Sequence, residues 1–265
     1  MSRTTPPKRP VPRREPPDSP LVVGHRGASA DRPENTLAAF DEAIRQGAGG
    51  IELDVQLSRD DVPVVYHDRS LRRAAGGLRR VAALDAAALA RLDAGRWFDS
   101  RYRGQRIPTL AQVLDRYATS VLLLIEMKLR GPEDARLHLA RTVAGLLRER
   151  RLERRTLLLC FDDKGLREAV RVAPRCRPVL NLDPPPRMTT AVRARLEGLH
   201  ALAVDVRGLT PSFAADVHTA GLPLYTYTCN TESSVRRSLA AGASGILSDR
   251  PGWLRERIAA LGEAR

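Results

Sequence analysis

Three carboxylates stand where short apolar runs of this sequence end. Glu52 and Asp54 belong to the run at 50–55, and Glu126 follows five aliphatic residues in the run at 121–127. Residues two apart in a strand share one face, so Glu52 and Asp54 point the same way. Carboxylates that converge from neighbouring strands favour one hard divalent ion, Mg2+ or Ca2+, with Mn2+ as a further candidate. The alternative is that each acid simply pairs with an arginine.

Basic side chains accompany these acids. His25 and Arg26 lie between two glycines after the run at 21–24, on a turn from which an imidazole and a guanidinium can reach an anion. Lys128 follows Glu126 by two residues, in a chain that uses arginine at all but three of its 44 basic positions. A lysine there indicates that a compact charge is required. Together with a divalent ion, Arg26 and Lys128 indicate an anionic substrate, most naturally a phosphate.

A predicted hairpin supplies a second imidazole. The run at 62–67 follows the previous one too closely for the crossover that parallel strands need, so it must return antiparallel. With Asp60 and Asp61 at the tip, the pairing places Asp54 opposite His67, with Cβ atoms roughly 5 Å apart. We expect His25 and His67 to be the general acid and base, in an order that the sequence leaves open.

The elements that position these groups alternate between strands and helices. Helical spacing lies between most of the apolar runs, as at 37–44 and 137–147. Strand then helix, eight times over about 245 residues, predicts a (β/α)8 TIM barrel, whose catalytic groups lie at the carboxyl ends of strands. A doubly wound open sheet is the alternative. Residues 70–108 are expected to form a short insertion after the strand-two hairpin. The predicted strands are 21–24, 50–55, 121–127, 156–161, 177–182, 201–206, 222–228 and 245–249.

Length and composition are those of one folded domain. The 265 residues are 43% hydrophobic, enough for a sizeable core, and we expect a single barrel at 21–265. Residues 1–20 are rich in proline and arginine, and we expect them to form a disordered tail. The sequence shows no apolar run long enough for a transmembrane segment and no secretory signal, so the expected location is the cytoplasm.

The formal net charge of +13 raises the question of a nucleic-acid partner. The arginines are spread through nearly every segment, and aromatic residues make up only 4% of the chain. Nucleic-acid binders gather basic charge and interleave aromatic residues for stacking. We therefore expect a solvated basic surface and no obligate nucleic-acid partner.

The ordered motifs of the chain resemble those of the glycerophosphodiester phosphodiesterase family. They are His25-Arg26-Gly27, Pro33-Glu34-Asn35-Thr36, Glu52-x-Asp54, His67-Asp68, Glu126-x-Lys128 and Ser248-Asp249-Arg250-Pro251. The resemblance implies a TIM barrel and a metal-dependent hydrolysis of glycerophosphodiesters to glycerol 3-phosphate and an alcohol. It also implies three groups of site residues: metal ligands Glu52, Asp54 and Glu126, acid and base His25 and His67, and phosphate-binding Arg26 and Lys128.

Two positions depart from the family pattern. Cys160-Phe161 stands where the family usually has Ser-Phe, and Tyr227-Thr228-Cys229-Asn230 stands where it usually has an indole. We expect Phe161, Tyr227 and Asn230 to line the alcohol or glycerol side of the pocket. The departures therefore bear on substrate preference and leave the reaction class intact.

Two other functions fit the same residues. A lysophospholipase D would use this pocket for a lipid substrate, and a non-catalytic anion-binding protein would hold phosphodiesters without turnover. The second would be expected to have lost a ligand or a histidine, and none is missing. The sequence does not determine the head group, the metal ion or the oligomeric state.

Overall fold

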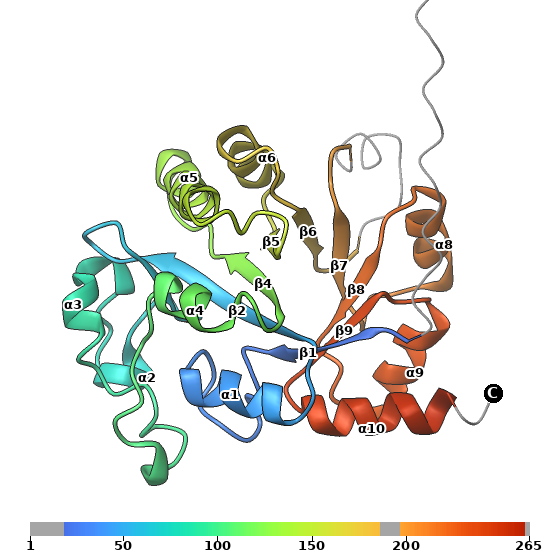
Figure 1. Ribbon diagram of the computed structural model, residues 1–265, viewed down its shortest axis with the longest axis horizontal. Helices are drawn as coiled ribbons and strands as arrows, with labels where there is room; N and C mark the ends of the chain where they lie inside the picture. Colours follow the sequence, from blue (N-terminus) through green and yellow to red (C-terminus); the bar gives the residue numbers. More distant parts are fainter. Residues whose placement is uncertain (1–18, 186–196, 263–265) are drawn as a thin grey trace, which may run out of the picture.

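The described residues form a barrel of eight parallel strands surrounded by helices (Figure 1). The computed structural model describes residues 19–185 and 197–262. Around the sheet the order is β1-β9-β8-β7-β6-β5-β4-β2, and pairing of β1 with β2 closes it. The predicted (β/α)8 barrel is confirmed, and the open sheet is excluded. Its strands are β1 (Leu21–His25), β2 (Gly50–Leu57), β4 (Leu122–Met127), β5 (Thr156–Cys160), β6 (Pro178–Leu182), β7 (Ala201–Asp205), β8 (Leu224–Tyr227) and β9 (Gly245–Ser248).

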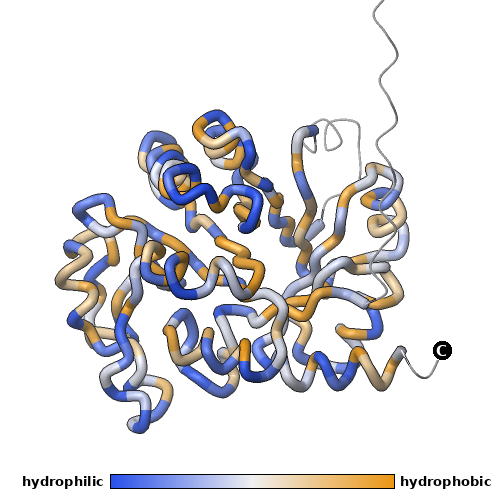
Figure 2. Tube along the Cα trace, viewed as in Figure 1, coloured by the Kyte–Doolittle hydropathy of each residue, from blue (hydrophilic) through white to orange (hydrophobic). Residues whose placement is uncertain are grey.

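Side chains alternate between the inside of the barrel and the layer beneath the helices. An apolar plug fills the inside, and hydrophobic residues run along the strands in Figure 2. The next inward-facing residue, two positions later along each strand, lies at the carboxyl end of the barrel, and most of these residues are polar. The plug includes Val23, Leu124, Leu159, Val179, Ala203, Tyr225 and Leu247, and the corresponding next positions are His25, Glu126, Phe161, Asn181, Asp205, Tyr227 and Asp249.

The helices cover the outside of the barrel, and α5 and α6 lie side by side (Figure 1). Side-chain N-caps open several of them, at Thr36, Thr109, Asp162, Thr210 and Thr231. The helices outside the insertion are α1 (Leu37–Arg45), α4 (Leu110–Tyr117), α5 (Glu133–Glu149), α6 (Asp163–Val172), α8 (Pro211–Thr219), α9 (Glu232–Ala240) and α10 (Pro251–Gly262).

The segment between the hairpin and α4 forms the insertion, at the left of Figure 1. It consists of short helices around a small core of its own that includes Leu71, Val81 and Leu89. Its elements are α2 (Arg72–Ala75), η1 (Val81–Ala83), α3 (Ala86–Leu89) and η2 (Ser100–Tyr102).

The hairpin is present, but its predicted register is wrong by one residue. Strand β3 (Pro63–Val65) pairs antiparallel with β2, with Val55 opposite Val65. The loop has three residues, because Ser58 N donates to the Val62 carbonyl and Asp61 adopts a left-handed φ of 59°. Tyr66 N therefore donates to the Asp54 carbonyl, and Asp54 stands opposite Tyr66 instead of His67. The imidazole reaches the site from the segment that follows β3.

The remaining expectations concern the chain ends and the bilayer. Apart from residues 19 and 20, the expected tail lies outside the described residues. Among the helices of the described ranges, none is both long and apolar enough to cross a membrane.

Candidate active site

Glu52, Asp54 and Glu126 form one acidic cluster at the carboxyl end of the barrel. The register sets Asp54 directly beside Glu126 on β4, and Glu52 beside His25 on β1. Glu52 and Asp54 are buried, and one oxygen of each of the three carboxylates lies within 4.8 Å of the others. The three acids predicted to converge from neighbouring strands are thus placed together, at a spacing that suits a single cation.

Negative charge in this cluster exceeds what its neighbours offset. Burial and the charge of Asp54 raise the pKa of Glu52 to about 8, and the same two causes raise the pKa of Glu126. Glu52 Oε1 is buried and has no hydrogen-bond partner in the described part of the chain. Three carboxylates, one of them with an unpaired oxygen, are ligands that suit a divalent cation, so the cluster can bind a metal ion.

Two cations border the acids. Lys128 Nζ lies 2.8 Å from Asp54 Oδ1 and also contacts Glu126 Oε1. Arg26 Nε lies 3.2 Å from Asp54 Oδ2, and its Nη1 donates to Glu34 Oε1 at 3.1 Å. Burial works to raise the pKa of Asp54, but Lys128 and Arg26 outweigh it, and that pKa is lowered. An anion that binds beside the acidic cluster would contact both Arg26 and Lys128.

The turn after β1 fixes where Arg26 points. Arg26 has a φ of 56°, and its backbone N–H donates to Glu52 Oε2 at 3.0 Å. Gly27 follows with a φ of 87°, and a Cβ at this position would lie 2.6 Å from the Ala39 carbonyl carbon on α1. Glycine is therefore required by both backbone conformation and close packing.

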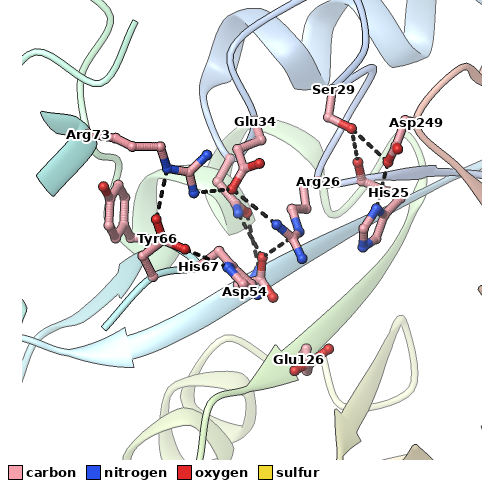
Figure 3. Close-up of polar contacts among 12 residues, drawn as sticks. His25, Arg26, Ser29, Glu34, Asp54, Tyr66, His67, Arg73, Glu126 and Asp249 are labelled. Carbon is pink, nitrogen blue, oxygen red and sulfur yellow. Dashed lines mark hydrogen bonds and ion pairs between the residues drawn. The ribbon is translucent and has the colours of Figure 1, made fainter. Parts of the chain in front are cut away.

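His25 is backed by the carboxylate of Asp249, which directly follows β9, the last strand of the barrel (Figure 3). Its Nδ1 lies 2.7 Å from Asp249 Oδ1, while Ser29 Oγ and Asn230 Nδ2 donate to Asp249 at 3.0 Å and 2.6 Å. Burial would raise the pKa of Asp249, but these hydrogen bonds lower it to about 2. Burial works to lower the pKa of His25, yet Asp249 and Glu52 outweigh it, and that pKa is raised.

His67 has a similar backing with a different charge balance. Its Nδ1 lies 2.9 Å from Asp68 Oδ1, and Arg73 Nε from the insertion donates to Asp68 Oδ2 at 2.8 Å. Buried Gln56 donates from Nε2 to the carbonyls of Tyr66 and Asp68 at 2.6 Å and 2.9 Å, which holds this backbone in place. Burial lowers the pKa of His67 and outweighs the nearby charge of Asp54.

Glu34 and Asn35 orient the site. Helix α1 begins at Leu37 behind the cap Thr36, so Asn35 does not cap it. Instead Asn35 Nδ2 donates to Asp54 Oδ2 at 2.8 Å, and its Oδ1 accepts from Asp54 N at 3.1 Å. Glu34 bridges Arg26 and Arg73 (Figure 3). These contacts fix Asp54 and Arg26 in the site.

The groups surround a cavity of about 320 Å³. Phe161 lies at its rim, 49% exposed, with its ring edge-on to Tyr227 at 6.5 Å. Both residues line the cavity. Asn230 is not among the lining residues that the structure describes, because its amide is turned to Asp249. Burial raises the pKa of Cys160 to about 12, which argues against a nucleophilic thiol. The lining includes His25, Arg26, Glu52, His67, Glu126, Lys128, Asn181 and Asp205.

Sequence reasoning missed Asn181 and Asp205, which enter the cavity from β6 and β7. Asn181 Nδ2 donates to Glu126 Oε2 at 3.3 Å, and Asp205 is paired with Arg207. The signal that could have found them is the two-residue alternation of each strand. Val179 and Ala203 face inward, so the residues two positions later must do so as well.

The fold and the site define an eight-stranded parallel barrel with an acidic cluster at its carboxyl end that could hold a metal ion. The model of the glycerophosphoryl diester phosphodiesterase family matches residues 25–253, and the chain belongs to this family. It is accordingly a phosphoric diester hydrolase.

Individual relatives agree over nearly the whole length. The chain is 31% identical to a glycerophosphodiester phosphodiesterase of Caldanaerobacter subterraneus, over 87% of this chain and 94% of the relative. It is 30% identical to one of Bacillus subtilis, over 89% and 85%. A phosphodiesterase of Oleispira antarctica, solved with the product sn-glycerol-3-phosphate, superposes with a TM-score of 0.80 at 28% identity, covering 91% of this chain and 97% of that one.

Proposed function

We propose that this protein hydrolyses glycerophosphodiesters to glycerol 3-phosphate and an alcohol. The observation that carries the proposal is the arrangement around one cavity of three carboxylates, two cations and two imidazoles, each imidazole backed by an aspartate. The product bound in the Oleispira antarctica structure supports the same substrate class.

Glu52, Asp54 and Glu126 would hold a divalent ion. Such an ion would supply Lewis acidity, which would activate the nucleophile and offset phosphate charge. Arg26 and Lys128 hold the non-bridging phosphate oxygens and counter the charge that develops on them. The choice among Mg2+, Ca2+ and Mn2+ stays a prediction, as does the cytoplasmic location.

The histidines move the protons. We assign the acid role to His25, because the other side-chain partners of Asp249 within the described ranges, Ser29 and Asn230, are neutral and leave its negative charge beside the ring. Asp68 shares its charge with Arg73, so His67 is favoured as the neutral base. His67 removes the proton of the attacking water or glyceryl hydroxyl as its oxygen bonds to phosphorus, the phosphorus–oxygen bond to the alcohol breaks, and His25 protonates the leaving oxygen. Where the hydroxyl attacks, water then opens the resulting cyclic phosphate to glycerol 3-phosphate.

Release of glycerol 3-phosphate from glycerophosphocholine and glycerophosphoethanolamine tests this proposal. Each divalent ion is compared with chelator, in the wild type and in Glu52→Ala. We expect metal-dependent release that the substitution abolishes, together with a melting temperature that the metal raises in the wild type and not in Glu52→Ala. The matched control is Glu256→Ala, which removes an exposed carboxylate on α10. Release that persists in chelator, or in Glu52→Ala, would contradict the metal assignment.

A second candidate is a lysophospholipase D reaction. The half-exposed ring of Phe161 at the rim could contact the chain of a lipid substrate. Comparison of lysophosphatidylcholine with glycerophosphocholine separates the two, and we expect faster turnover of glycerophosphocholine. A protein that binds phosphodiesters without releasing product from either substrate would be the non-catalytic alternative.

A further inference from the structure

Asn181 on β6 carries an unused hydrogen-bond acceptor into the cavity. The residue is only 3% exposed, and its Oδ1 has no hydrogen-bond partner within the described residues. A buried acceptor without a partner destabilises the folded protein. Its burial is therefore best explained by a donor that arrives with a ligand.

One hydrogen bond sets the orientation of this amide. Asn181 Nδ2 donates to Glu126 Oε2 at 3.3 Å, so the NH2 group faces that carboxylate. The carbonyl oxygen is left without a partner among the described residues, and a hydroxyl that enters the cavity can donate to it. An anionic phosphate oxygen has no proton to offer and does not satisfy it.

The position within the barrel indicates which part of a substrate this donor belongs to. The phosphate-binding groups and His25 lie on or near β1, β2 and β4, whereas Asn181 lies beyond Glu126 on β6. Asn181 is buried, and Phe161 at the rim is 49% exposed. The half that is common to all glycerophosphodiesters suits the enclosed position, and the variable alcohol suits the rim.

We propose that Asn181 Oδ1 accepts a hydrogen bond from the terminal hydroxyl of the glyceryl half of the substrate. Asn181 is then a specificity-determining residue for glycerol over deoxy analogues, and this inference rests on the proposed function. A site that satisfies a buried acceptor with a substrate hydroxyl discriminates against the analogue that lacks it.

The test compares glycerophosphocholine with 2-hydroxypropyl phosphocholine, which keeps the hydroxyl next to the phosphoester carbon and lacks the terminal one. In Asn181→Leu, the ratio of the two kcat/KM values should fall by about 10- to 100-fold relative to the wild type. Glu256→Leu is the matched control, because it places a leucine at an exposed position on α10, and the ratio should not change. If both substrates lose activity equally in Asn181→Leu, the residue only positions Glu126, and the inference is overturned.

Binding of products gives the same comparison without turnover. Calorimetry with metal-loaded protein should show tighter binding of glycerol 3-phosphate than of 2-hydroxypropyl phosphate in the wild type, and equal binding in Asn181→Leu. Wild-type protein that shows this preference but does not hydrolyse glycerophosphocholine would contradict the proposed function and leave the role of Asn181 standing. Wild-type protein without the preference would overturn the role. Circular dichroism checks the fold, and Asn181→Ala repeats the comparison if the leucine variant does not fold.

Discussion

His25 Nδ1 and Asp249 Oδ1 lie 2.7 Å apart across the seam where β9 pairs with β1 (Figure 3). Because the carboxylate accepts from Nδ1, the other ring nitrogen is left for the cavity, where Nε2 lies 3.9 Å from Glu52 Oε2. Asp249, directly after the last strand, thus fixes the tautomer and direction of the His25 imidazole at the end of the first strand.

Asp249→Asn tests this positioning role. Asp249 raises the pKa of His25, and the proposed acid must be protonated, so activity is lost as pH rises through that pKa. Removing the charge lowers the pKa, and the alkaline limb of the pH profile should move to lower pH while kcat falls on the order of a hundredfold.

Asp68→Asn is the matched comparison for the other imidazole. Its charge acts on His67, so the alkaline limb should stay where it is in the wild type. An unchanged alkaline limb in Asp249→Asn, or an equal shift in both variants, would count against the assignment of the acid.

Removal of either imidazole should abolish turnover and leave the fold intact. His25→Ala and His67→Ala are each expected to lose several orders of magnitude in kcat, because proton transfer contributes about 10²- to 10⁴-fold for each group. The measurement is steady-state hydrolysis of glycerophosphocholine, with near-ultraviolet circular dichroism to verify the fold. Activity within tenfold of the wild type in either variant would exclude that histidine from the chemistry.

Gly27→Ala should be strongly destabilising. The added Cβ meets the backbone of Ala39 at 2.6 Å, and the φ of 87° is unfavourable for alanine. Gly104→Ala separates these causes, because its φ is 94° but a Cβ there has no described atom within 4 Å. We expect a loss of roughly 1 kcal/mol at Gly104 and of at least about 3 kcal/mol at Gly27, measured by urea unfolding. Similar losses at both positions would show that packing against α1 is unimportant.

Glu42 on α1 should make stability depend on acidic pH. The hydrogen bond from Arg45 outweighs burial and lowers the pKa of Glu42 to about 2. A carboxyl whose pKa is lower in the folded state stabilises fully above its unfolded pKa, near 4.3, and loses this contribution as pH falls toward 2. Between pH 5 and pH 3 the wild type should therefore lose more urea resistance than Glu42→Gln. Parallel losses in the two proteins would refute the linkage.

The sequence allowed the barrel and most of the site to be predicted for a simple physical reason. Carboxyl ends of parallel strands meet at one mouth, so Glu52, Asp54 and Glu126 could be brought together by strand order alone. The hairpin register could not be obtained in this way. It depends on the left-handed φ of Asp61, which an aspartate adopts without the glycine that would signal it.

Supporting residues were harder to predict than reacting ones. Gln56 and Arg73 act through contacts between segments, to the 66–68 backbone and to Asp68 respectively. No local pattern marks such contacts. Asn181 could have been found by extending the inward alternation of β6, but one asparagine at a strand end is unspecific until its neighbours are known.

The most direct test of the proposed reaction is ³¹P NMR of glycerophosphocholine incubated with the purified protein and Mg2+. We predict that its resonance is replaced by that of glycerol 3-phosphate, and that neither chelator-treated protein nor Glu52→Ala produces this change. Appearance of phosphocholine would mean that the other ester bond is cleaved. An unchanged spectrum with Mg2+, Mn2+ and Ca2+ would contradict the account.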